Sequence, residues 1–227
     1  MSFLRQPDPQ PGGWIKKSCC MKNTLTLHEI SSRLVKRAPP VKAPTGRGRS
    51  RGEIPAKAGD LTCAAVLVPL VHRDQEWHLV FTHRTHMVES HKGQVSFPGG
   101  ACQSGETAEQ TALREAEEEI GLRPQDVRLL GRLGEMDTIT AYRITPLVGS
   151  IPWPYSFRPS PTEVERVFSI PIQWLADRRN WQEKKVTSLD GTGSVAVIIY
   201  QPYEGEILWG ASARITMEFL QVVGLLQ

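Results

Sequence analysis

The sequence predicts an α/β protein whose mixed β-sheet is covered on both faces by helices. Apolar runs with strand character stand before and after one central helical pattern, and a second helical pattern follows the last run. This alternation begins near residue 60, and chains of about 150 residues already remove about 68–70% of their surface from water. One folded domain, residues 60–227, is therefore expected after an N-terminal arm, residues 1–59.

The arm differs from the domain in composition, being rich in Pro, Gly, Lys and Arg and poor in acidic residues. Its charge exceeds the formal net charge of +3 of the whole chain, so the domain is net acidic. The basic run at residues 47–51 has no interleaved aromatic residues and belongs to no recognised nucleic-acid-binding module. A solvated linker is therefore favoured, and no nucleic-acid partner is expected.

A short amphipathic helix is expected within the arm, near residues 26–38. Thr26 and Glu29 have the spacing of a capping box. The residues that follow on one helical face are apolar: Leu27, Ile30 and Leu34. This face is expected to dock on the domain.

No segment is long and apolar enough to cross a bilayer, and the first residues lack the apolar centre of a secretory signal. A cytoplasmic protein with no membrane partner is therefore expected. A mitochondrial location is the less favoured alternative, because the early Lys and Arg residues are accompanied by prolines and Asp8.

The 4 cysteines of the chain form no C-x-x-C pair. This spacing argues against a zinc ribbon and against a disulfide framework. Free thiols are therefore expected at Cys19, Cys20, Cys63 and Cys102.

The elements of the domain follow in order. Strands are expected at residues 61–71 and 78–82, on either side of a turn-like segment. The central helix is expected at residues 107–120. Later apolar runs predict further strands at 127–133, 138–148 and 194–200 and a last helix at 211–223.

The central helix is the most informative element, because Glu115, Glu118 and Glu119 stand at i, i+3 and i+4 and share one face. Two like charges about 6 Å apart repel by roughly 1 kcal/mol in water and by more in a shielded site. Arg114 lies about 100° around the helix from Glu115 and is expected to pair with Glu106 instead, which leaves the cluster without a neighbouring cation. A divalent cation would relieve the repulsion, and Mg²⁺, with Mn²⁺ as a substitute, suits oxygen ligands.

Two further signals support this helix. A stripe of small and apolar residues at four-residue spacing predicts its buried side: Ala108, Ala112, Ala116 and Ile120. Gly121 follows the last turn, where a left-handed cap residue is expected.

Together these residues resemble the signature of the Nudix hydrolases, G-x5-E-x7-R-E-U-x-E-E-x-G-U with U aliphatic. The matching positions are Gly100, Glu106, Arg114, Glu115, Ala116, Glu118, Glu119, Gly121 and Leu122. Ala116 is smaller than the residue usual at its position. The alternative, a solvated acidic helix face, is disfavoured by the number of positions that agree.

The resemblance implies a Nudix-type α/β/α sandwich and the cleavage of a nucleoside diphosphate linked to a second group. It implies that Glu115 and Glu119 bind the metal ion, that Glu118 is a ligand or close to one, and that a backbone carbonyl near Gly99 or Gly100 completes the site. The Glu106–Arg114 pair is structural in this interpretation. The catalytic base is left open between Glu118 and Glu163.

A finer resemblance, to the coenzyme A diphosphatase branch, rests on residues upstream of the acidic helix. Arg84, Gly93 and the Phe97–Gly100 run have the spacing of that branch, but Glu89 stands where it has a second arginine. Segments 142–149, 159–172 and 208–214 also resemble the branch.

The expected reaction is Mg²⁺-dependent hydrolysis of coenzyme A or acyl-coenzyme A to 3′,5′-ADP and (acyl-)4′-phosphopantetheine. Arg84 is expected to contact phosphate, with a salt bridge at a strand end as its alternative role, and Gly99 and Gly100 are expected to line the substrate site. The alternatives are another nucleotide substrate (NADH, ADP-ribose or a nucleoside triphosphate) and a non-catalytic nucleotide sensor. The residues predict no oligomeric state.

Overall fold

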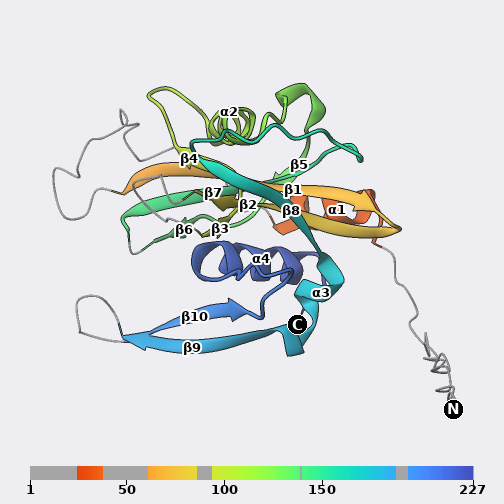
Figure 1. Cartoon of the computed structure of the whole chain (residues 1–227), viewed down its shortest axis with the longest axis vertical. Helices are drawn as coiled ribbons and strands as arrows, with labels where there is room; N and C mark the ends of the chain where they lie inside the picture. Colours follow the sequence, from red (N-terminus) through yellow and green to blue (C-terminus); the bar gives the residue numbers. More distant parts are fainter. Residues whose placement is uncertain (1–24, 38–60, 86–93, 139, 188–193, 227) are drawn as a thin grey trace, which may run out of the picture.

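A mixed β-sheet lies between two helical layers in the computed structural model (Figure 1). The structure describes residues 25–37, 61–85, 94–138, 140–187 and 194–226. The predicted α/β class and the covering of both sheet faces are confirmed. The helices are α1 (Leu27–Arg37), α2 (Ala108–Ile120), α3 (Ile172–Ala176) and α4 (Gly210–Val222), with short 3₁₀ turns η1 (Pro124–Asp126) and η2 (Arg178–Asn180).

The sheet has the strand order β3-β2-β1-β7-β5, with β4 paired to β1, β6 to β7 and β8 to β2. β1 and β7 run parallel along their length, and the other pairs are antiparallel. The strands of this sheet are β1 (Thr62–Arg73), β2 (Glu76–Arg84), β3 (Val95–Ser96), β4 (Gly99–Ala101), β5 (Arg128–Arg132), β6 (Met136–Asp137), β7 (Tyr142–Ser150) and β8 (Val164–Pro171).

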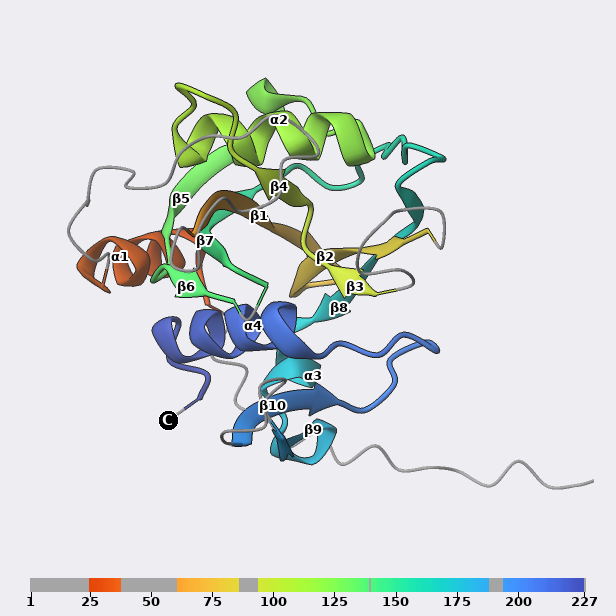
Figure 2. The same ribbon diagram turned by 90° about the vertical axis from the view of Figure 1, so that its left-hand side faces the viewer.

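The two faces of β1 and β2 pack against different helices, because successive strand residues point to opposite sides. Leu67 of β1 and Val80 of β2 belong to one apolar cluster with the buried stripe of α2. Val68 and Phe81, one residue further along, belong to the cluster on the α4 side. Figure 2 shows α2 and α4 on opposite sides of the strands.

The helix expected in the arm is present as α1. Its capping box is formed, with the Thr26 N–H 2.8 Å from a Glu29 carboxylate oxygen and the Glu29 N–H 3.2 Å from the Thr26 hydroxyl. Ile30 and Leu34 are fully buried. Leu34 packs closely on β5, since a Cβ atom added at Gly131 would lie 2.9 Å from the Leu34 Cβ. The rest of the arm lies outside the described residues, and the boundary near residue 59 stays a prediction.

Several elements were not expected from the sequence: the strands β3, β4, β6, β8 and β9 (Trp181–Thr187), the short helix α3 and the 3₁₀ turns η1 and η2. β9 pairs with β10 (Ser194–Tyr200) in a separate two-stranded sheet. Gln182, Glu183, Lys184 and Lys185 of β9 are exposed, so this strand lacks the apolar alternation that identifies a half-buried strand.

The expectation of free thiols is wrong for two of the cysteines, because Cys63 and Cys102 form a disulfide. β1 and β4 pair with Ala64 opposite Ala101, and the Cys102 N–H donates to the Cys63 carbonyl at 2.9 Å. The strand register therefore places the two side chains together although they are 39 residues apart in the sequence. Cys19 and Cys20 lie outside the described residues.

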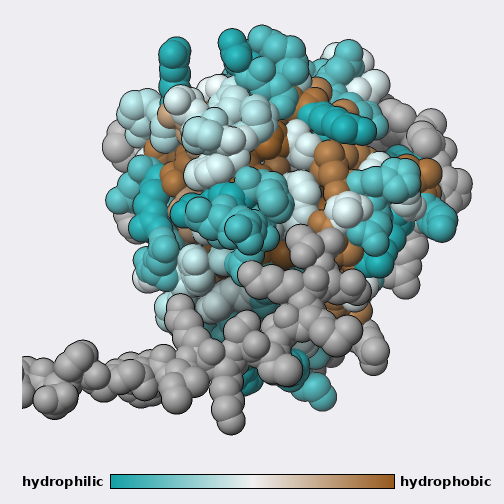
Figure 3. All heavy atoms as spheres, turned by 90° about the vertical axis from the view of Figure 1, so that its right-hand side faces the viewer, coloured by the Kyte–Doolittle hydropathy of each residue, from teal (hydrophilic) through white to brown (hydrophobic). Residues whose placement is uncertain are grey.

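The surface on one side of the molecule is mostly hydrophilic, with small apolar areas between the polar ones (Figure 3). Among the described residues, no helix combines the length and the hydropathy needed to cross a membrane.

The docking of α1 can be tested with Leu34→Ala. Truncating a buried leucine removes its contacts and leaves a cavity, so we expect a loss of about 2–5 kcal/mol in the free energy of unfolding. Val35→Ala is the matched control, because Val35 is 66% exposed on the same helix. Urea unfolding measures both, and equal small effects for the two variants would contradict the docking of α1 on the domain.

Candidate active site

The helix that carries the acidic cluster, α2, is capped at both ends by its own sequence. The Thr107 hydroxyl accepts from the Gln110 N–H at 3.2 Å, and the Gln110 side chain accepts from the Thr107 N–H at 2.8 Å. Gly121 takes the left-handed conformation, with φ of 67°, and its N–H donates to the Glu117 carbonyl at 2.9 Å. These caps satisfy backbone groups at the helix ends. The predicted helix and its glycine cap are confirmed.

The three glutamates differ in burial. Glu119 is buried with 1% of its side chain exposed, Glu115 is 15% exposed and Glu118 is 58% exposed. Glu119 points toward the sheet, where its carboxylate accepts from the Gly99 N–H at 3.3 Å. The exposure of the carboxylates therefore increases from Glu119, in the protein interior, through Glu115 to Glu118, at the surface.

Strand β4 forms the wall next to Glu115. A Cβ added at Gly100 would lie 2.5 Å from the Glu115 Cδ, closer than non-bonded atoms can approach. The absence of a side chain at Gly100 therefore leaves room for the carboxylate against the β4 backbone.

The expectation that no cation lies beside the cluster is wrong. Arg114 does pair with Glu106, through Nε to Oε1 at 2.7 Å and Nη2 to Oε2 at 3.0 Å. Its Nη1 also donates to Glu115 at 2.7 Å and to Glu118 at 3.2 Å. The angle of 100° between neighbouring helix positions describes only the directions of the Cα atoms. The arginine side chain is long enough to reach Glu115 and Glu118 in spite of this angle.

A second guanidinium, from Arg84 at the end of β2, lies on the other side of the cluster. Its Nη1 is 2.8 Å from the Glu119 Oε1, and 19% of the Arg84 side chain is exposed. Arg84 and Glu119 are 35 residues apart in the sequence. In this structure Arg84 has the salt bridge that was the alternative to a phosphate contact.

The pKa values follow from this arrangement. Burial raises the pKa of Glu119 to about 7, against the lowering influence of Arg84 and the Gly99 N–H. Burial also raises the pKa of Glu115, with Arg114 opposing and the charges of Glu118 and Glu163 reinforcing it. Because both carboxyls resist ionisation in this site, a cation beside them is electrostatically favourable.

Glu163 approaches the cluster from the start of β8. Its charge contributes, after burial and the charge of Glu118, to raising the pKa of the Glu115 carboxyl. The segment is fixed to the end of β2, because the Thr85 N–H donates to the Glu163 carbonyl at 3.0 Å and the Thr85 hydroxyl to the Thr162 carbonyl at 2.9 Å. The same turn contacts the last turn of α2, because the Ser160 N–H donates to the Glu119 carbonyl at 2.8 Å, although 44 residues separate Glu163 from Glu119 in the sequence.

The residues fit a divalent cation by their chemistry. Glu115, Glu118 and Glu119 supply carboxylate oxygens, the ligands that Mg²⁺ prefers, and the charge of Glu115 raises the pKa of Glu119. No three His, Cys, Asp or Glu side chains of the described ranges form a ready-made ion site. In this structure Arg84 pairs with Glu119 and Arg114 with Glu115. An ion would take over charge compensation that the two guanidinium groups now provide.

Sequence reasoning missed Thr111, whose hydroxyl donates to the Glu106 carboxylate at 2.8 Å and helps to hold Glu106 against Arg114. No sequence signal singles out Thr111, because its burial and its contact with Glu106 are seen only in the structure. Gly93 and Glu89, two positions used in the comparison with the coenzyme A diphosphatase branch, lie outside the described residues.

Comparisons with known proteins identify the family. A family model described as "NUDIX domain" matches residues 61–189. The chain is 36% identical over 163 residues, which cover 71% of this chain and 83% of the relative, to "Uncharacterized Nudix hydrolase NudL" of Escherichia coli O6:H1. The protein of the same description in Escherichia fergusonii is 35% identical over the same shares. Among solved structures, a MutT/nudix family protein from Enterococcus faecalis matches 77% of this chain and 71% of its own, with 13% identity and a TM-score of 0.46.

The Glu106–Arg114 pair predicts a pH-dependent contribution to stability. The Arg114 guanidinium lowers the pKa of Glu106 from 4.5 to about 2, so the folded state favours the ionised form. This stabilisation is complete above pH 4.5 and is lost as the pH falls toward 2. We expect Glu106→Gln to cost about 1–2 kcal/mol in the free energy of unfolding at pH 7 and much less at pH 2.5.

Urea unfolding at the two pH values measures this difference. Glu109→Gln, on the exposed side of the same helix, controls for the loss of one negative charge. A cost for Glu106→Gln that stays the same at both pH values would show that the pair contributes no charge-dependent stability.

Proposed function

Because the chain belongs to the Nudix hydrolase family, we propose that it hydrolyses the diphosphate bond of coenzyme A or an acyl-coenzyme A, releasing 3′,5′-ADP and (acyl-)4′-phosphopantetheine. The observation that supports this proposal best is the meeting of two separate motifs at one carboxylate. Glu119 of the acidic helix contacts Arg84 and the Gly99 N–H, which both belong to the upstream segment that resembles the coenzyme A diphosphatase branch.

Mg²⁺, with Mn²⁺ as a substitute, is the proposed cofactor. Glu115, Glu118 and Glu119 would hold it, together with a backbone carbonyl near Gly99 or Gly100. When bound, such an ion polarises phosphoryl oxygens and lowers the pKa of a coordinated water.

The other residues act on the substrate and on the proton of the attacking water. Glu118 and Glu163 remain the two candidates for the base: Glu118 is more exposed than Glu115 and Glu119, and Glu163 lies in the turn that precedes β8. A carboxylate in either place can accept a proton from water within hydrogen-bond reach.

We propose that Arg84 first pairs with Glu119 and then with a phosphate of the substrate. Its guanidinium pairs with Glu119 in the structure described above. A phosphate of the substrate offers two oxygens to the same planar group, so that Arg84 can exchange the carboxylate for phosphate when a cation has taken over the charge of Glu119.

The substrate can be identified by incubating the purified protein and Mg²⁺ with coenzyme A, NADH, ADP-ribose and nucleoside triphosphates. We expect coenzyme A to give 4′-phosphopantetheine and 3′,5′-ADP, measured by mass spectrometry, with the other compounds cleaved more slowly. Cleavage of another compound without phosphopantetheine release would replace the coenzyme A assignment and keep the family chemistry. Binding without cleavage of any compound would favour the nucleotide sensor.

The metal assignment predicts different effects for two glutamates that stand two residues apart on α2. Glu119→Gln should lower turnover on the order of 100-fold or more, since altering even the outer partners of metal ligands costs 10–100-fold. Glu117→Gln is the matched control, because Glu117 belongs to the same acidic run and its side chain is exposed.

A second readout is thermal stability with and without metal. Mg²⁺ or Mn²⁺ should raise the melting temperature of the wild type and of Glu117→Gln, because an ion that binds only the folded state stabilises it. The increase should be much smaller for Glu119→Gln. Equal increases in all three proteins would mean that Glu119 is not a ligand.

A further inference from the structure

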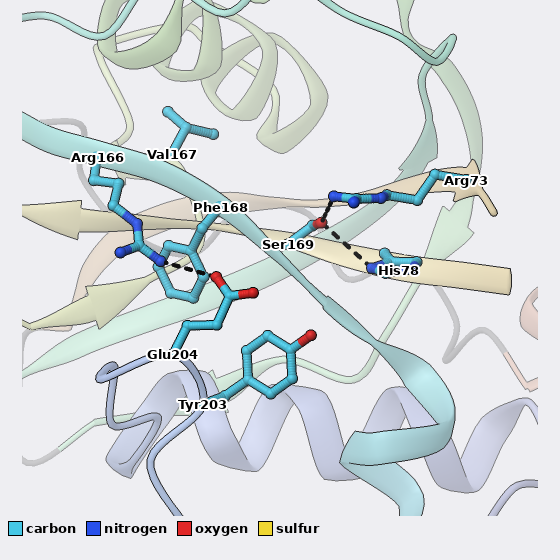
Figure 4. Close-up of a pocket in the computed structure, with 8 residues that line it drawn as sticks. All are labelled: Arg73, His78, Arg166, Val167, Phe168, Ser169, Tyr203 and Glu204. Atoms are coloured by element: carbon cyan, nitrogen blue, oxygen red, sulfur yellow. Dashed lines mark hydrogen bonds and ion pairs between the residues drawn. The ribbon is translucent and has the colours of Figure 1, made fainter. Parts of the chain in front are cut away.

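A second concave region, separate from the acidic helix, lies along strand β8 (Figure 4). It encloses about 320 Å³. The side chains that line it are mostly polar or charged: Arg73, His78, Arg166, Val167, Phe168, Ser169, Tyr203 and Glu204. We call it the β8-edge pocket.

The pocket extends around the strand because β8 is paired on one side only within the described strands, to β2. Phe168 packs in the cluster on the α4 side, and Val167 packs in the cluster on the α2 side. Arg166 and Ser169 follow the same alternation, so Arg166 lies on the α4 side and Ser169 on the α2 side.

Two guanidinium groups stand at opposite ends of the pocket, with hydroxyl groups between them (Figure 4). The Arg166 guanidinium lies over the Phe168 ring, 5.1 Å from its centroid. At the other end, Arg73 Nη1 is 3.4 Å from the Ser169 hydroxyl, which also lies 3.3 Å from His78 Nδ1. Positive charge and hydroxyl donors of this kind recognise phosphate oxygens.

The acidic residues near Arg166 do not neutralise it firmly. Glu204, 3.3 Å from Arg166, is 64% exposed, so the pair is worth little in water. Glu206 lies 3.7 Å from Arg166 but makes a closer contact, 2.8 Å, with His83 Nδ1. An anionic ligand could therefore displace Glu204 at small cost.

The wall that carries Tyr203 and Glu204 is fixed in place. Tyr203 and Glu206 exchange two backbone hydrogen bonds of 2.9 Å, which close a tight turn, and the Glu206 contact with His83 ties this turn to β2. The pocket is thus formed before any ligand binds, which lowers the entropic cost of binding.

The pocket adjoins the candidate active site through the register of β2 and β8. Arg84, which contacts Glu119, pairs with Val164, and His83 pairs with Arg166. Two residues along a strand span about 7 Å. Arg84 lies on the α2 side of the sheet and Arg166 on the α4 side, so a ligand whose diphosphate lies near Arg84 would reach Arg166 by passing around the edge of β8 that has no partner among the described strands.

We propose that the β8-edge pocket binds the ribose 3′-phosphate of the substrate, with Arg166 as its main partner. This inference rests on the proposed function, because coenzyme A carries a phosphate at that position, separated from its diphosphate by one ribose ring. The neutral pantetheine arm fits the pocket less well, since it offers no charge to the two guanidinium groups.

The binding test uses protein kept metal-free with EDTA and two ligands that differ only in the 3′-phosphate, 3′,5′-ADP and 5′-AMP. By calorimetry we expect 3′,5′-ADP to bind the wild type on the order of tenfold more tightly, the equivalent of about 1.4 kcal/mol. Arg166→Gln should remove this difference, and Glu204→Gln should increase it by removing the competing carboxylate.

Arg179→Gln is the matched control, because Arg179 is 87% exposed and pairs with Asp177, a residue that does not line the pocket. It should keep the wild-type preference. Equal affinity of the wild type for the two ligands, or a preference that Arg166→Gln leaves unchanged, would overturn the proposal. Melting temperatures of the variants identify any that fail to fold, and Glu204→Gln, an exposed change with the opposite expected sign, then tests the pocket alone.

Turnover separates the pocket from the proposed function. With coenzyme A and 3′-dephospho-coenzyme A, we expect kcat/KM to be about tenfold higher for coenzyme A in the wild type and similar for both in Arg166→Gln. Equal hydrolysis of both by the wild type would refute the pocket assignment and leave the reaction intact. No hydrolysis of either would refute the reaction, and a retained preference for 3′,5′-ADP in the calorimetry would still support the pocket.

Discussion

The buried carboxylate of Glu119 is the constraint on which the candidate site depends. With 1% of its side chain exposed, Glu119 cannot rely on water for its charge. The Arg84 guanidinium and the Gly99 N–H supply the compensation, and they come from two strands on the sheet next to α2. The position of α2 on the sheet, the end of β2 and the start of β4 are therefore linked through one buried carboxyl group.

A second chain of contacts orients the more exposed part of the cluster. Glu106 holds Arg114 through two hydrogen bonds, Thr111 holds Glu106, and Arg114 in turn contacts Glu115. Arg114 also donates to the Ala101 carbonyl at 3.3 Å, beside the disulfide formed by Cys102. The pair that the sequence identified as structural thus also touches a proposed metal ligand, so its two roles are not separable.

Features that depend on the spacing of residues within one segment could be predicted from the sequence, and features that depend on contacts between distant segments could not. The acidic face of α2, its alanine stripe and its glycine cap depend on spacings within one helix, and these were predicted. The Arg84–Glu119 contact, the Cys63–Cys102 bond and the place of β8 beside β2 depend on strand pairing across 35 or more residues. Spacing within one segment carries no information on such pairing, and β9 was missed because its exposed residues hide the strand pattern.

The proposed binding of an extended ligand depends on the edge of β8 that has no partner among the described strands. Its first residues bring Glu163 toward the helix glutamates, and Arg166 and Ser169 then point to opposite sides of the sheet. A paired strand in the sheet centre would have both edges occupied by neighbours and could form no pocket that passes around it. Because β8 is bonded to β2 alone among the described strands, its free side can face a ligand while its paired side keeps Arg84 and Val164 in register. In the proposed mode of binding, this edge position lets β8 contact substrate groups beyond the diphosphate.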